Sequence, residues 1–275
     1  MNPEPLEIQL KQCLIQWNAI PQGSYRVTPS SLLQPVVCQG QQAMIKISRT
    51  PDEQRGAALM VWWQGHGAAH VLAQKGDAML LERITGERSL TDMANAGLDD
   101  EVSTLFCSVA SRLHTPRPTP LPALISLAEA FSSLQRAAAE RQEIYKDAWG
   151  VAEELFNSPQ DIHVLHGDLH HENILDGGVR GWLAIDPKGY QGERTFDFAN
   201  LFCNPRPRPV GSHERMDRQV ALVCEAAALD SQRLLAWIFS WAALSSAWFL
   251  EDGESADIPL HVAQQARQLL LRRTA

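Results

Sequence analysis

The chain contains 275 residues, of which 45% are hydrophobic and 20% are charged, and its formal net charge is -8 at pH 7. Such a chain can bury a substantial core as one large domain or two lobes, and its acidity argues against a nucleic-acid-binding protein, whose surface is usually basic. The five cysteines are scattered without a CxxC pair, which argues against a zinc ribbon or a disulfide framework.

The N-terminal part of the chain has the sequence pattern of a small sheet with two helices. Its first ten residues carry Glu4 and Glu7 and lack the apolar core of a signal peptide, so we expect a cytoplasmic protein. Apolar residues recur at helical spacing from Leu6 to Trp17, and Pro51-Asp-Glu53 is typical of a second helix start. Strands are predicted at 25–27, 32–38, 43–48, 70–74 and 78–82, with turns at 39–42 and 75–77.

After Gly86 the sequence becomes mainly helical in pattern. Helices are predicted at 98–114, 124–139 and 140–157, and three more are expected after the loop at 204–209. A proline-rich linker at 115–122 separates the first two of these helices. Two short strands near Ile174 and Trp182 flank a Gly177-Gly178 turn and interrupt this helical half.

The uncharged segment 234–250 has to be weighed as a membrane span. It is slightly short for a comfortable span, it contains Ser240, Ser245 and Ser246, and no second segment could pair with it. We therefore predict a buried helix and no contact with a membrane.

The most informative stretch is His166-Gly-Asp-Leu-His-His-Glu-Asn173, which is followed by Ile185-Asp-Pro-Lys188. Asn173 lies five positions after Asp168, and a strand-like run ends at a second carboxylate, Asp186. Carboxylate and amide oxygens suit Mg²⁺, and phosphoryl transfer needs a neutralised phosphate and an acceptor oxygen held in line. Each residue alone could be a turn former, a cap or a strand-end acid. Their order favours a kinase, in which Asp168 orients the acceptor hydroxyl while Asn173 and Asp186 hold the metal.

These motifs, together with Gly192-Glu-Arg-Thr-Phe-Asp197, resemble the aminoglycoside phosphotransferase family, and within it the streptomycin kinase and hydroxyurea-resistance kinase group. The similarity runs from about Tyr25 to the C-terminal helices and is strongest at 163–202. The resemblance implies a two-lobed, protein-kinase-like α+β fold. The implied lobes are a small antiparallel-sheet, nucleotide-binding lobe at 1–84 and a larger, mostly helical catalytic and substrate-binding lobe at 85–275, with a hinge at about 81–85.

The resemblance also assigns nucleotide contacts in the N-terminal lobe. Lys46 matches the strand lysine that contacts the α- and β-phosphates, although alone it would be read as a surface lysine. Glu53 could pair with Lys46 or be only a helix-start acid, because the next-turn position where such a glutamate is expected is Gly56. Ser30 and Ser31 stand where the phosphate-covering loop should be, and they could cradle phosphate or form an ordinary polar turn.

Further residues take supporting roles in this comparison. The backbone from Glu82 to Ile84 resembles the hinge that reads the adenine edge. His166 matches a scaffold histidine, and Asp197 matches an aspartate that braces the catalytic loop. Lys188 belongs to the motif of the subgroup and could either offset phosphate charge or be solvated.

The histidines suggest a remote alternative, a zinc metallohydrolase. His166, Asp168, His170 and His171 form a cluster that resembles the ligand sets of such enzymes. Their order does not fit the familiar pattern, and no distant ligands with flanking strands are evident.

The resemblance implies ATP and Mg²⁺ as cofactors and a hydroxyl of a small molecule as acceptor, with streptomycin or a related aminoglycoside as the substrate to be inactivated. The loop 204–209 and the C-terminal helices would form the acceptor pocket. Arg206 and Arg208 in that loop suit a polycation poorly, which keeps open a kinase for an endogenous or anionic metabolite. A kinase-like binding protein is a further alternative, although the complete residue set argues against it. Nothing in the sequence predicts an oligomeric state.

Overall fold

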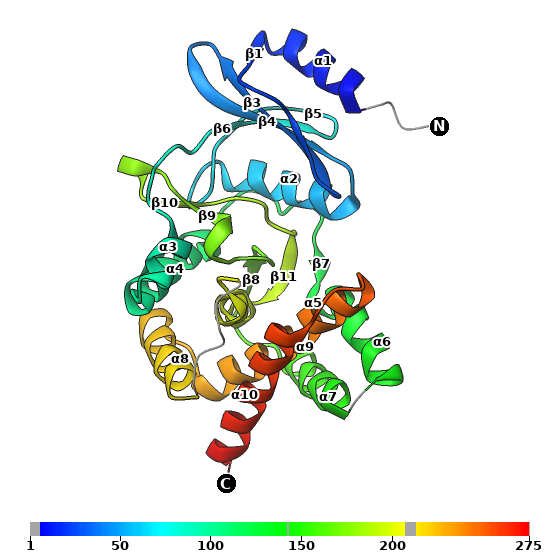
Figure 1. The fold of residues 1–275 in the computed structure, drawn as a ribbon, viewed down its shortest axis with the longest axis vertical. Coiled ribbons are helices and arrows are strands. Elements are labelled where there is room, and N and C mark those ends of the chain that lie inside the picture. Colours follow the sequence, from blue (N-terminus) through cyan, green and yellow to red (C-terminus); the bar gives the residue numbers. More distant parts are fainter. Residues whose placement is uncertain (1–5, 142, 207–212, 275) are drawn as a thin grey trace.

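The computed structural model describes residues 6–141, 143–206 and 213–274, and it combines a six-stranded antiparallel sheet with a largely helical body (Figure 1). The sheet-containing part consists of α1 (Leu6–Gln16), β1 (Ala19–Pro21), β2 (Arg26–Val27), β3 (Ser31–Cys38), β4 (Gln41–Ser48), α2 (Pro51–Trp63), β5 (Val71–Lys75) and β6 (Ala78–Glu82). The strand order is β1-β3-β4-β6-β5, and β2 also pairs with β3.

The β3–β4 hairpin determines which face of the sheet Lys46 occupies. Gln39 and Gly40 have φ angles of 51° and 79°, as a two-residue hairpin turn requires, so the turn is shorter than the predicted 39–42. Ile45 and Ile47 belong to the apolar cluster that α1 covers. Because side chains alternate along a strand, Lys46 lies on the opposite face, toward α2.

Helix α2 begins where the sequence predicts it. Thr50 has extended backbone angles, and its side chain accepts a hydrogen bond from the backbone N–H of Glu53, while Pro51 occupies the first turn. The C-cap residue after the helix is Gln64, which adopts the left-handed conformation with φ of 50°. Trp63, near this end, is fully buried in the large core.

The rest of the chain builds the helical body and two small sheets. Its elements are α3 (Leu90–Asn95), α4 (Asp99–His114), β7 (Ile125–Ser126), α5 (Leu127–Ala130), α6 (Ser132–Glu140), α7 (Glu143–Asn157), β8 (Ile162–Leu165), η1 (His171–Asn173), β9 (Ile174–Asp176), η2 (Gly178–Arg180), β10 (Trp182–Ala184), β11 (Tyr190–Glu193), η3 (Arg194–Cys203), α8 (His213–Ala227), α9 (Ser231–Glu251) and α10 (Asp257–Thr274). The β9–β10 hairpin and the three terminal helices agree with the sequence prediction.

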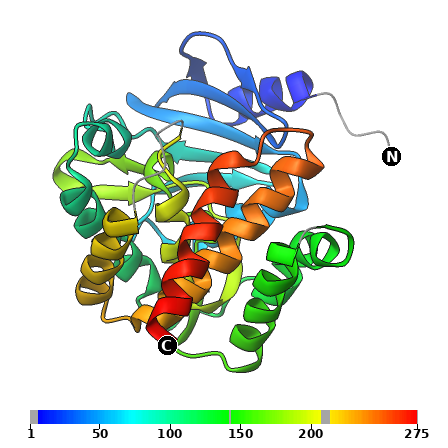
Figure 2. The same cartoon turned by 60° about the horizontal axis from the view of Figure 1, so that its bottom comes forward.

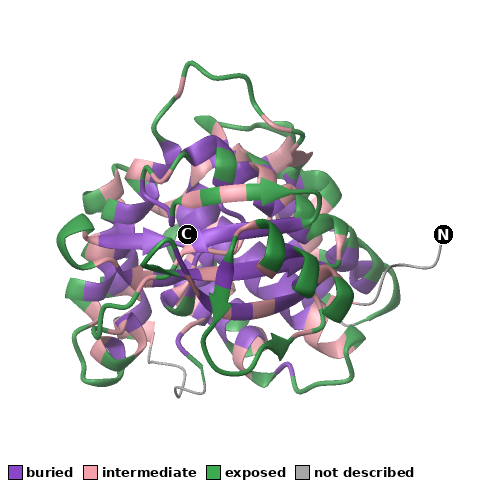
Figure 3. Ribbon diagram, turned by 90° about the horizontal axis from the view of Figure 1, so that it is seen from above, coloured by how far each residue is buried: buried purple, intermediate pink, exposed green. Residues whose placement is uncertain are grey.

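Helix α9 is a core helix of this body. It packs against α7, η3 and α10. Helices α9 and α10 lie side by side along most of their length (Figure 2). Among the described residues it is the one helix long and apolar enough to cross a bilayer. Of its most apolar 18-residue stretch, however, 72% is buried inside the protein. This burial agrees with the helix predicted at 234–250. Seen from above, buried residues gather along the central strands and helices, and exposed residues occupy the connecting loops and the outer faces of helices (Figure 3).

The single helix predicted at 124–139 is wrong. The backbone N–H of Ile125 donates to the carbonyl of Gly189, and this parallel pairing forms strand β7. Ser126 and Glu129 then form a capping box that starts the short helix α5. Strands β1, β8 and β11 and helix α3 were not predicted, because they are only three to six residues long and their pairing is not local.

Two apolar clusters stabilise the molecule. The smaller lies between α1 and the sheet, and it includes Leu10 and Leu32. The larger continues from α2 through to α10, and it includes Trp63 and Trp237. Helix α2 precedes position 84 and still contributes to the large cluster, so the two clusters do not divide the chain at 84/85. The lobes at 1–84 and 85–275 therefore stay a prediction.

Candidate active site

One buried carboxylate, that of Asp197 in η3, fixes the start of the loop after β8. It accepts hydrogen bonds from the backbone N–H groups of His166 at 2.9 Å and Gly167 at 2.8 Å. His114 Nε2 lies 2.8 Å from the same carboxylate. Burial alone would raise the pKa of Asp197, but the hydrogen bond from His114 and the surrounding donors hold this pKa below its ordinary value. Asp197 therefore stays ionised and holds the loop in place.

Gly167 is required by the shape of this loop. Its φ angle of 84° is in the left-handed region, and a Cβ at this position would lie 2.6 Å from the ring of Tyr190. Any side chain here would push apart the loop and β11, which lie on either side of the contact.

His166 supports the loop through both ring nitrogens. Its Nε2 donates to the carbonyl of Ile185 at 2.8 Å, and its Nδ1 accepts from the backbone N–H of Asp168 at 3.2 Å, so the ring is neutral. Burial lowers the pKa of His166, which favours the same neutral form. Since both nitrogens are engaged, His166 has no lone pair to offer zinc. Within the described residues no group of three His, Cys, Asp or Glu side chains is arranged to hold a metal, so the zinc alternative gains no support.

Asp168 projects from this loop with its side chain 28% exposed. Its Oδ1 accepts a hydrogen bond of 3.0 Å from the side-chain amide of Asn200. Its backbone carbonyl accepts a bond of 2.9 Å from Asn173 Nδ2, so the loop turns back as the spacing of the two residues suggested. The amide nitrogen of Asn173 is thereby engaged, and its Oδ1 accepts no hydrogen bond from the part of the chain that the structure describes.

Asp186 lies beside Asn173 and contacts Lys46. The backbone N–H of Ile185 donates to the carbonyl of Asn173 at 2.9 Å, which brings the residue before β9 close to the segment that follows β10. Asp186 has a φ angle of 58°, in the left-handed region that few non-glycine residues adopt and in which aspartate is enriched. Its Oδ1 lies 2.8 Å from Lys46 Nζ, and its side chain is 40% exposed.

Lys46 forms a second ion pair with Glu53 of α2, and both side chains are buried. Burial alone would lower the pKa of Lys46, but the carboxylates of Asp186 and Glu53 together raise it above its ordinary value. The lysine is therefore a fixed cation at the base of the site. The sequence left open whether Glu53 pairs with Lys46 or is only a helix-start acid, and in the structure the two side chains form an ion pair.

The unexpected glycine at position 56 has a packing reason. A Cβ on Gly56 would lie 2.0 Å from the backbone carbonyl oxygen of Pro187, the residue after Asp186. No glutamate could therefore stand where it was expected, and the helix supplies Glu53 from one turn earlier.

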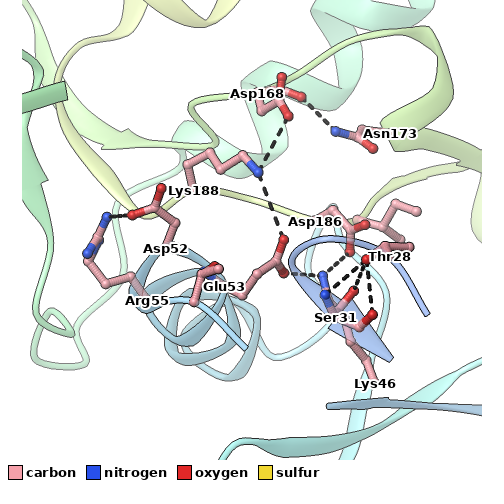
Figure 4. A network of polar contacts seen from close by, with 12 residues as sticks. Thr28, Ser31, Lys46, Asp52, Glu53, Arg55, Asp168, Asn173, Asp186 and Lys188 are labelled. Carbon is pink, nitrogen blue, oxygen red and sulfur yellow. Dashed lines mark hydrogen bonds and ion pairs between the residues drawn. The ribbon is translucent and has the colours of Figure 1, made fainter. Parts of the chain in front are cut away.

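Lys188 lies between the carboxylates of Glu53 and Asp168 (Figure 4). Its Nζ is 3.9 Å from Glu53 Oε1 and 3.9 Å from Asp168 Oδ2, too far for a strong hydrogen bond to either. Its backbone N–H donates to the carbonyl of His166 at 2.7 Å, which anchors the lysine to the loop. Lys188 is thus an anchored cation beside Asp168 and is not fully solvated.

The two serines of the predicted phosphate loop differ in their surroundings. Ser31 is buried, and its backbone N–H donates to Thr28 Oγ1 at 2.9 Å while its hydroxyl lies 3.1 Å from the same oxygen (Figure 4). The carbonyl of Ser30 accepts from the backbone N–H of Arg49 at 2.8 Å, and its side chain is half-buried. Ser31 therefore closes the turn internally, and Ser30 is the better placed of the two to meet a ligand.

The predicted hinge follows β6 directly. The backbone N–H of Arg83 donates to the carbonyl of Gln42 at 3.2 Å. Because backbone groups alternate along an extended chain, the groups of Glu82 and Ile84 point away from β4. The N–H of Ile84 donates to none of the described residues. The backbone N–H of Glu82 donates to the carbonyl of His70 at 2.9 Å. Its side chain pairs with Arg180 and accepts a hydrogen bond of 2.6 Å from the backbone N–H of His70.

Sequence reasoning missed the residues behind Asp168. Asn200 Oδ1 accepts from Trp241 Nε1 at 3.0 Å and from Asn204 Nδ2 at 2.9 Å, which fixes the orientation of its amide toward Asp168. Asn200 lies three positions after Asp197, but its distance from Asp168 along the sequence gave no signal of contact.

The candidate acceptor side lies next to this network. Arg206 lies over the ring of Phe249, with 4.5 Å between its Cζ and the ring centroid. Arg208 and the rest of the predicted loop from 207 onward lie outside the described residues.

The donor set fits a magnesium ion better than a transition metal. Asn173 Oδ1 and the Asp186 carboxylate are hard oxygen ligands, and Mg²⁺ usually takes one or two carboxylates together with phosphate oxygens and water.

Residues 16–253 match the family described as aminoglycoside/hydroxyurea antibiotic resistance kinases. The chain belongs to this kinase family. It is 44% identical to streptomycin 3''-kinase of Klebsiella pneumoniae over 265 residues, which cover 93% of this chain and 99% of that protein. It is 31% identical to streptomycin 6-kinase of Streptomyces griseus, with 92% of this chain and 85% of that protein covered.

Solved structures agree with the fold that the resemblance implied. The aminoglycoside phosphotransferase APH(4)-Ia matches with a TM-score of 0.68 at 13% identity, covering 97% of this chain and 98% of that one. An amicoumacin kinase matches with a TM-score of 0.66 at 13% identity, covering 98% and 94%. These likenesses confirm the two-lobed, kinase-like α+β fold. Membership of the kinase family makes the protein a phosphotransferase that uses an alcohol group as acceptor.

Proposed function

We propose that this kinase transfers the γ-phosphate of ATP to the 3''-hydroxyl of streptomycin in a Mg²⁺-dependent reaction, which inactivates the antibiotic. The observation that carries the reaction type is the position of Asp168. One of its carboxylate oxygens is fixed by Asn200, and the residue stands beside Asn173 on one side and Lys188 on the other. A cytoplasmic location, where ATP is available, fits this reaction.

The nucleotide would bind between the sheet and the helical body. Lys46 is a buried cation, and it would exchange its contact with Asp186 for the α- and β-phosphates while keeping Glu53 as a partner. The N–H of Ile84 and the carbonyl of Glu82 would meet the adenine edge, and Ser30 would lie over the phosphates. Asn173 and Asp186 would hold Mg²⁺, which when bound neutralises charge on the phosphate oxygens.

Asp168 would act on the acceptor. With Oδ1 engaged by Asn200, Oδ2 is the oxygen left to accept the proton of the streptomycin hydroxyl. The acceptor oxygen forms the new bond to the γ-phosphorus as the bond from that phosphorus to the β–γ bridging oxygen breaks, and ADP leaves. Lys188 Nζ lies 3.9 Å from this carboxylate, close enough to offset charge on the transferred phosphoryl group.

The substrate rests on the relatives. The identity to the streptomycin 3''-kinase is 44%, against 31% and 28% for two streptomycin 6-kinases and 29% for a hydroxyurea phosphotransferase. This ranking supports streptomycin over hydroxyurea, and the 3'' position over position 6. The cation of Arg206 rests on Phe249, so one of the two arginines that suited a polycation poorly already has an aromatic partner.

A panel of acceptors tests the proposal. The purified protein with Mg²⁺ and ATP should consume ATP with streptomycin and not with hygromycin B or hydroxyurea, and phosphorus NMR of the product should place the phosphate on the 3''-hydroxyl. Expression should raise the streptomycin concentration that a sensitive bacterium survives. Consumption of ATP only with an endogenous or anionic hydroxyl compound would instead support the metabolite-kinase alternative, and tight nucleotide binding without transfer to any acceptor would support a binding protein.

A further inference from the structure

A second cavity lies behind the candidate active site, at the far end of α2. It has a volume of about 590 Å³, and its walls come from the C-terminal ends of α2 and α4, the linker after α4, and the segment at 180–183. Trp62, Trp63, Arg112, Arg117, Arg180 and Leu183 are among the residues that line it. None of the residues proposed above for nucleotide, metal or acceptor contact lines this cavity.

The cavity is electropositive in an acidic protein. Three arginines are among its lining residues, although the chain as a whole carries a net charge of -8. Within the described residues, the single carboxylate paired with any of them is Glu82, which contacts Arg180. Arg112 and Arg117 donate to backbone carbonyls only, which are neutral acceptors.

The positive charge at this cavity is incompletely compensated. The Nε of Arg112 is buried and has no hydrogen-bond partner among the described residues. Burial lowers the pKa of Arg112, and the nearby cation of Arg180 lowers it further. Burial likewise lowers the pKa of Arg117. The lowered pKa values of Arg112 and Arg117 have the sign expected of cations that lack a counter-ion. An anion bound in the cavity would supply that counter-ion.

The remaining walls are apolar and aromatic. Trp62, Trp63 and Leu183 line the cavity together with Pro118. The guanidinium of Arg117 lies 4.9 Å from the centroid of the Trp62 ring, which shows that a flat cationic group and an aromatic face are stacked at the wall. Such walls favour a ligand with a flat apolar body as well as a charged group.

We propose that this cavity is a binding site for a small aromatic anion, whose charged group would meet Arg112 and Arg180 and whose ring would lie against Trp62 and Leu183. An inorganic anion lacks the apolar body, and an uncharged aromatic compound leaves the arginines uncompensated. The ligand class is therefore set by the combination of charge and ring, and it does not depend on the identity of the phosphorylated substrate.

The walls of the cavity connect to the candidate active site. The ring of Trp63 stacks on that of His166, with ring centroids 6.0 Å apart, and His166 holds the backbone of Asp168. Arg180 pairs with Glu82 of the hinge. A bound anion that draws Arg180 toward the cavity would loosen this pair, so we expect occupancy to change the KM for ATP.

Calorimetric titration with naphthyl phosphate tests the site, with naphthol and inorganic phosphate as matched probes for the ring and the charge. Saturating ADP is present throughout, so that the nucleotide cleft is blocked. We expect saturable binding of one naphthyl phosphate per chain, and at least tenfold weaker binding of the other two probes. Absence of saturable binding, or equal binding of inorganic phosphate, would overturn the proposal.

Two variants locate the binding. Thr119→Trp fills the cavity without removing an arginine, and Arg112→Gln removes one charge; each should weaken naphthyl phosphate at least tenfold. Arg218→Gln, an exposed arginine of α8 paired with Asp100, is the control for the charge change and should bind as the wild type does. Arg112 also donates to the carbonyl of Trp182, so Arg112→Gln could fail to fold. In that case the Thr119→Trp result alone decides whether the ligand binds in this cavity. Unchanged affinity in Thr119→Trp would exclude this cavity.

Discussion

The side-chain amide of Asn200 donates a hydrogen bond of 3.0 Å to Oδ1 of Asp168, and this contact fixes which carboxylate oxygen is left for the acceptor. Trp241 and Asn204 both donate to Asn200 Oδ1, so the amide cannot turn over without losing two bonds. The orientation of the proposed base is therefore set by α9 and η3, far along the chain from the loop that carries it.

Replacing Asn200 with alanine should lower kcat by about 10- to 100-fold, because loss of one hydrogen bond to a charged group costs about 1.5–3 kcal/mol. The KM for ATP should change little, since Asn200 contacts no proposed nucleotide group. Steady-state kinetics with streptomycin measures both parameters. Asn157→Ala, at the exposed end of α7, is the control and should match the wild type. Equal losses in kcat and in ATP affinity would contradict a role limited to Asp168.

Replacing Glu53 with glutamine should weaken the use of ATP. The variant removes one of the two carboxylates that hold Lys46, which is then drawn toward Asp186 and away from the phosphates. We expect kcat/KM for ATP to fall by about tenfold or more, since a charge-assisted bond contributes about 1.5–3 kcal/mol. Asp52→Asn, at the neighbouring exposed acid paired with Arg55, should have little effect. An unchanged kcat/KM in Glu53→Gln would leave the pair with only a structural role.

Gly56→Ala should destabilise the protein and impair the site together. The new Cβ would lie 2.0 Å from the carbonyl oxygen of Pro187, so α2 and the segment after Asp186 must separate. Forced separation of well-packed elements costs typically about 1–3 kcal/mol. Gly150→Ala is the matched control, because nothing lies within 4 Å of its Cβ and alanine favours the helix. Chemical denaturation should find Gly56→Ala less stable than the wild type and Gly150→Ala equal to it or more stable; equal stability of the two variants would contradict the packing.

Acidification should destabilise the wild type through His166. Burial lowers the pKa of His166 below its ordinary value of 6.5, so the unfolded chain takes up this proton at a higher pH than the folded one. Stability is therefore fully present above the unfolded pKa and is lost as the pH falls toward the folded pKa, at up to about 1.4 kcal/mol per pH unit.

The free energy of unfolding at about pH 7.5 and about pH 5.5 measures this effect. The wild type should lose more of it between these values than His166→Asn does, although the variant should be less stable at both. His261→Asn, which removes an exposed imidazole, controls for the loss of a histidine. A loss of equal size in wild type and His166→Asn would contradict a buried neutral ring.

Much of the fold and the core of the site could be predicted from local pattern. Asp168 and Asn173 lie in one short loop, and Asp186 follows the next hairpin, so their contact needs no distant partner. Lys46 could be assigned to a strand by alternation, and α2 by its cap and first turn.

The remaining features depend on contacts between distant segments. Trp241 meets Asn200, the partner of Asp168, only when η3 and α9 pack together, and no periodicity in the sequence reports that contact. Gly56 is unexplained until Pro187 is seen against it, and the short strands β7, β8 and β11 exist only as partners of one another. The cavity that joins Arg112 to Arg180 is likewise a product of packing.

The central claim is that Asp168 accepts the proton of the streptomycin hydroxyl during transfer, and Asp168→Asn tests it most directly. The asparagine keeps the size of the side chain while losing its basicity. Rapid-mixing measurement of phosphorylated streptomycin should find transfer slowed by about 100- to 10,000-fold relative to the wild type, with the dissociation constant for the Mg²⁺ complex of ATP within about threefold. Transfer at the wild-type rate in Asp168→Asn would contradict the account.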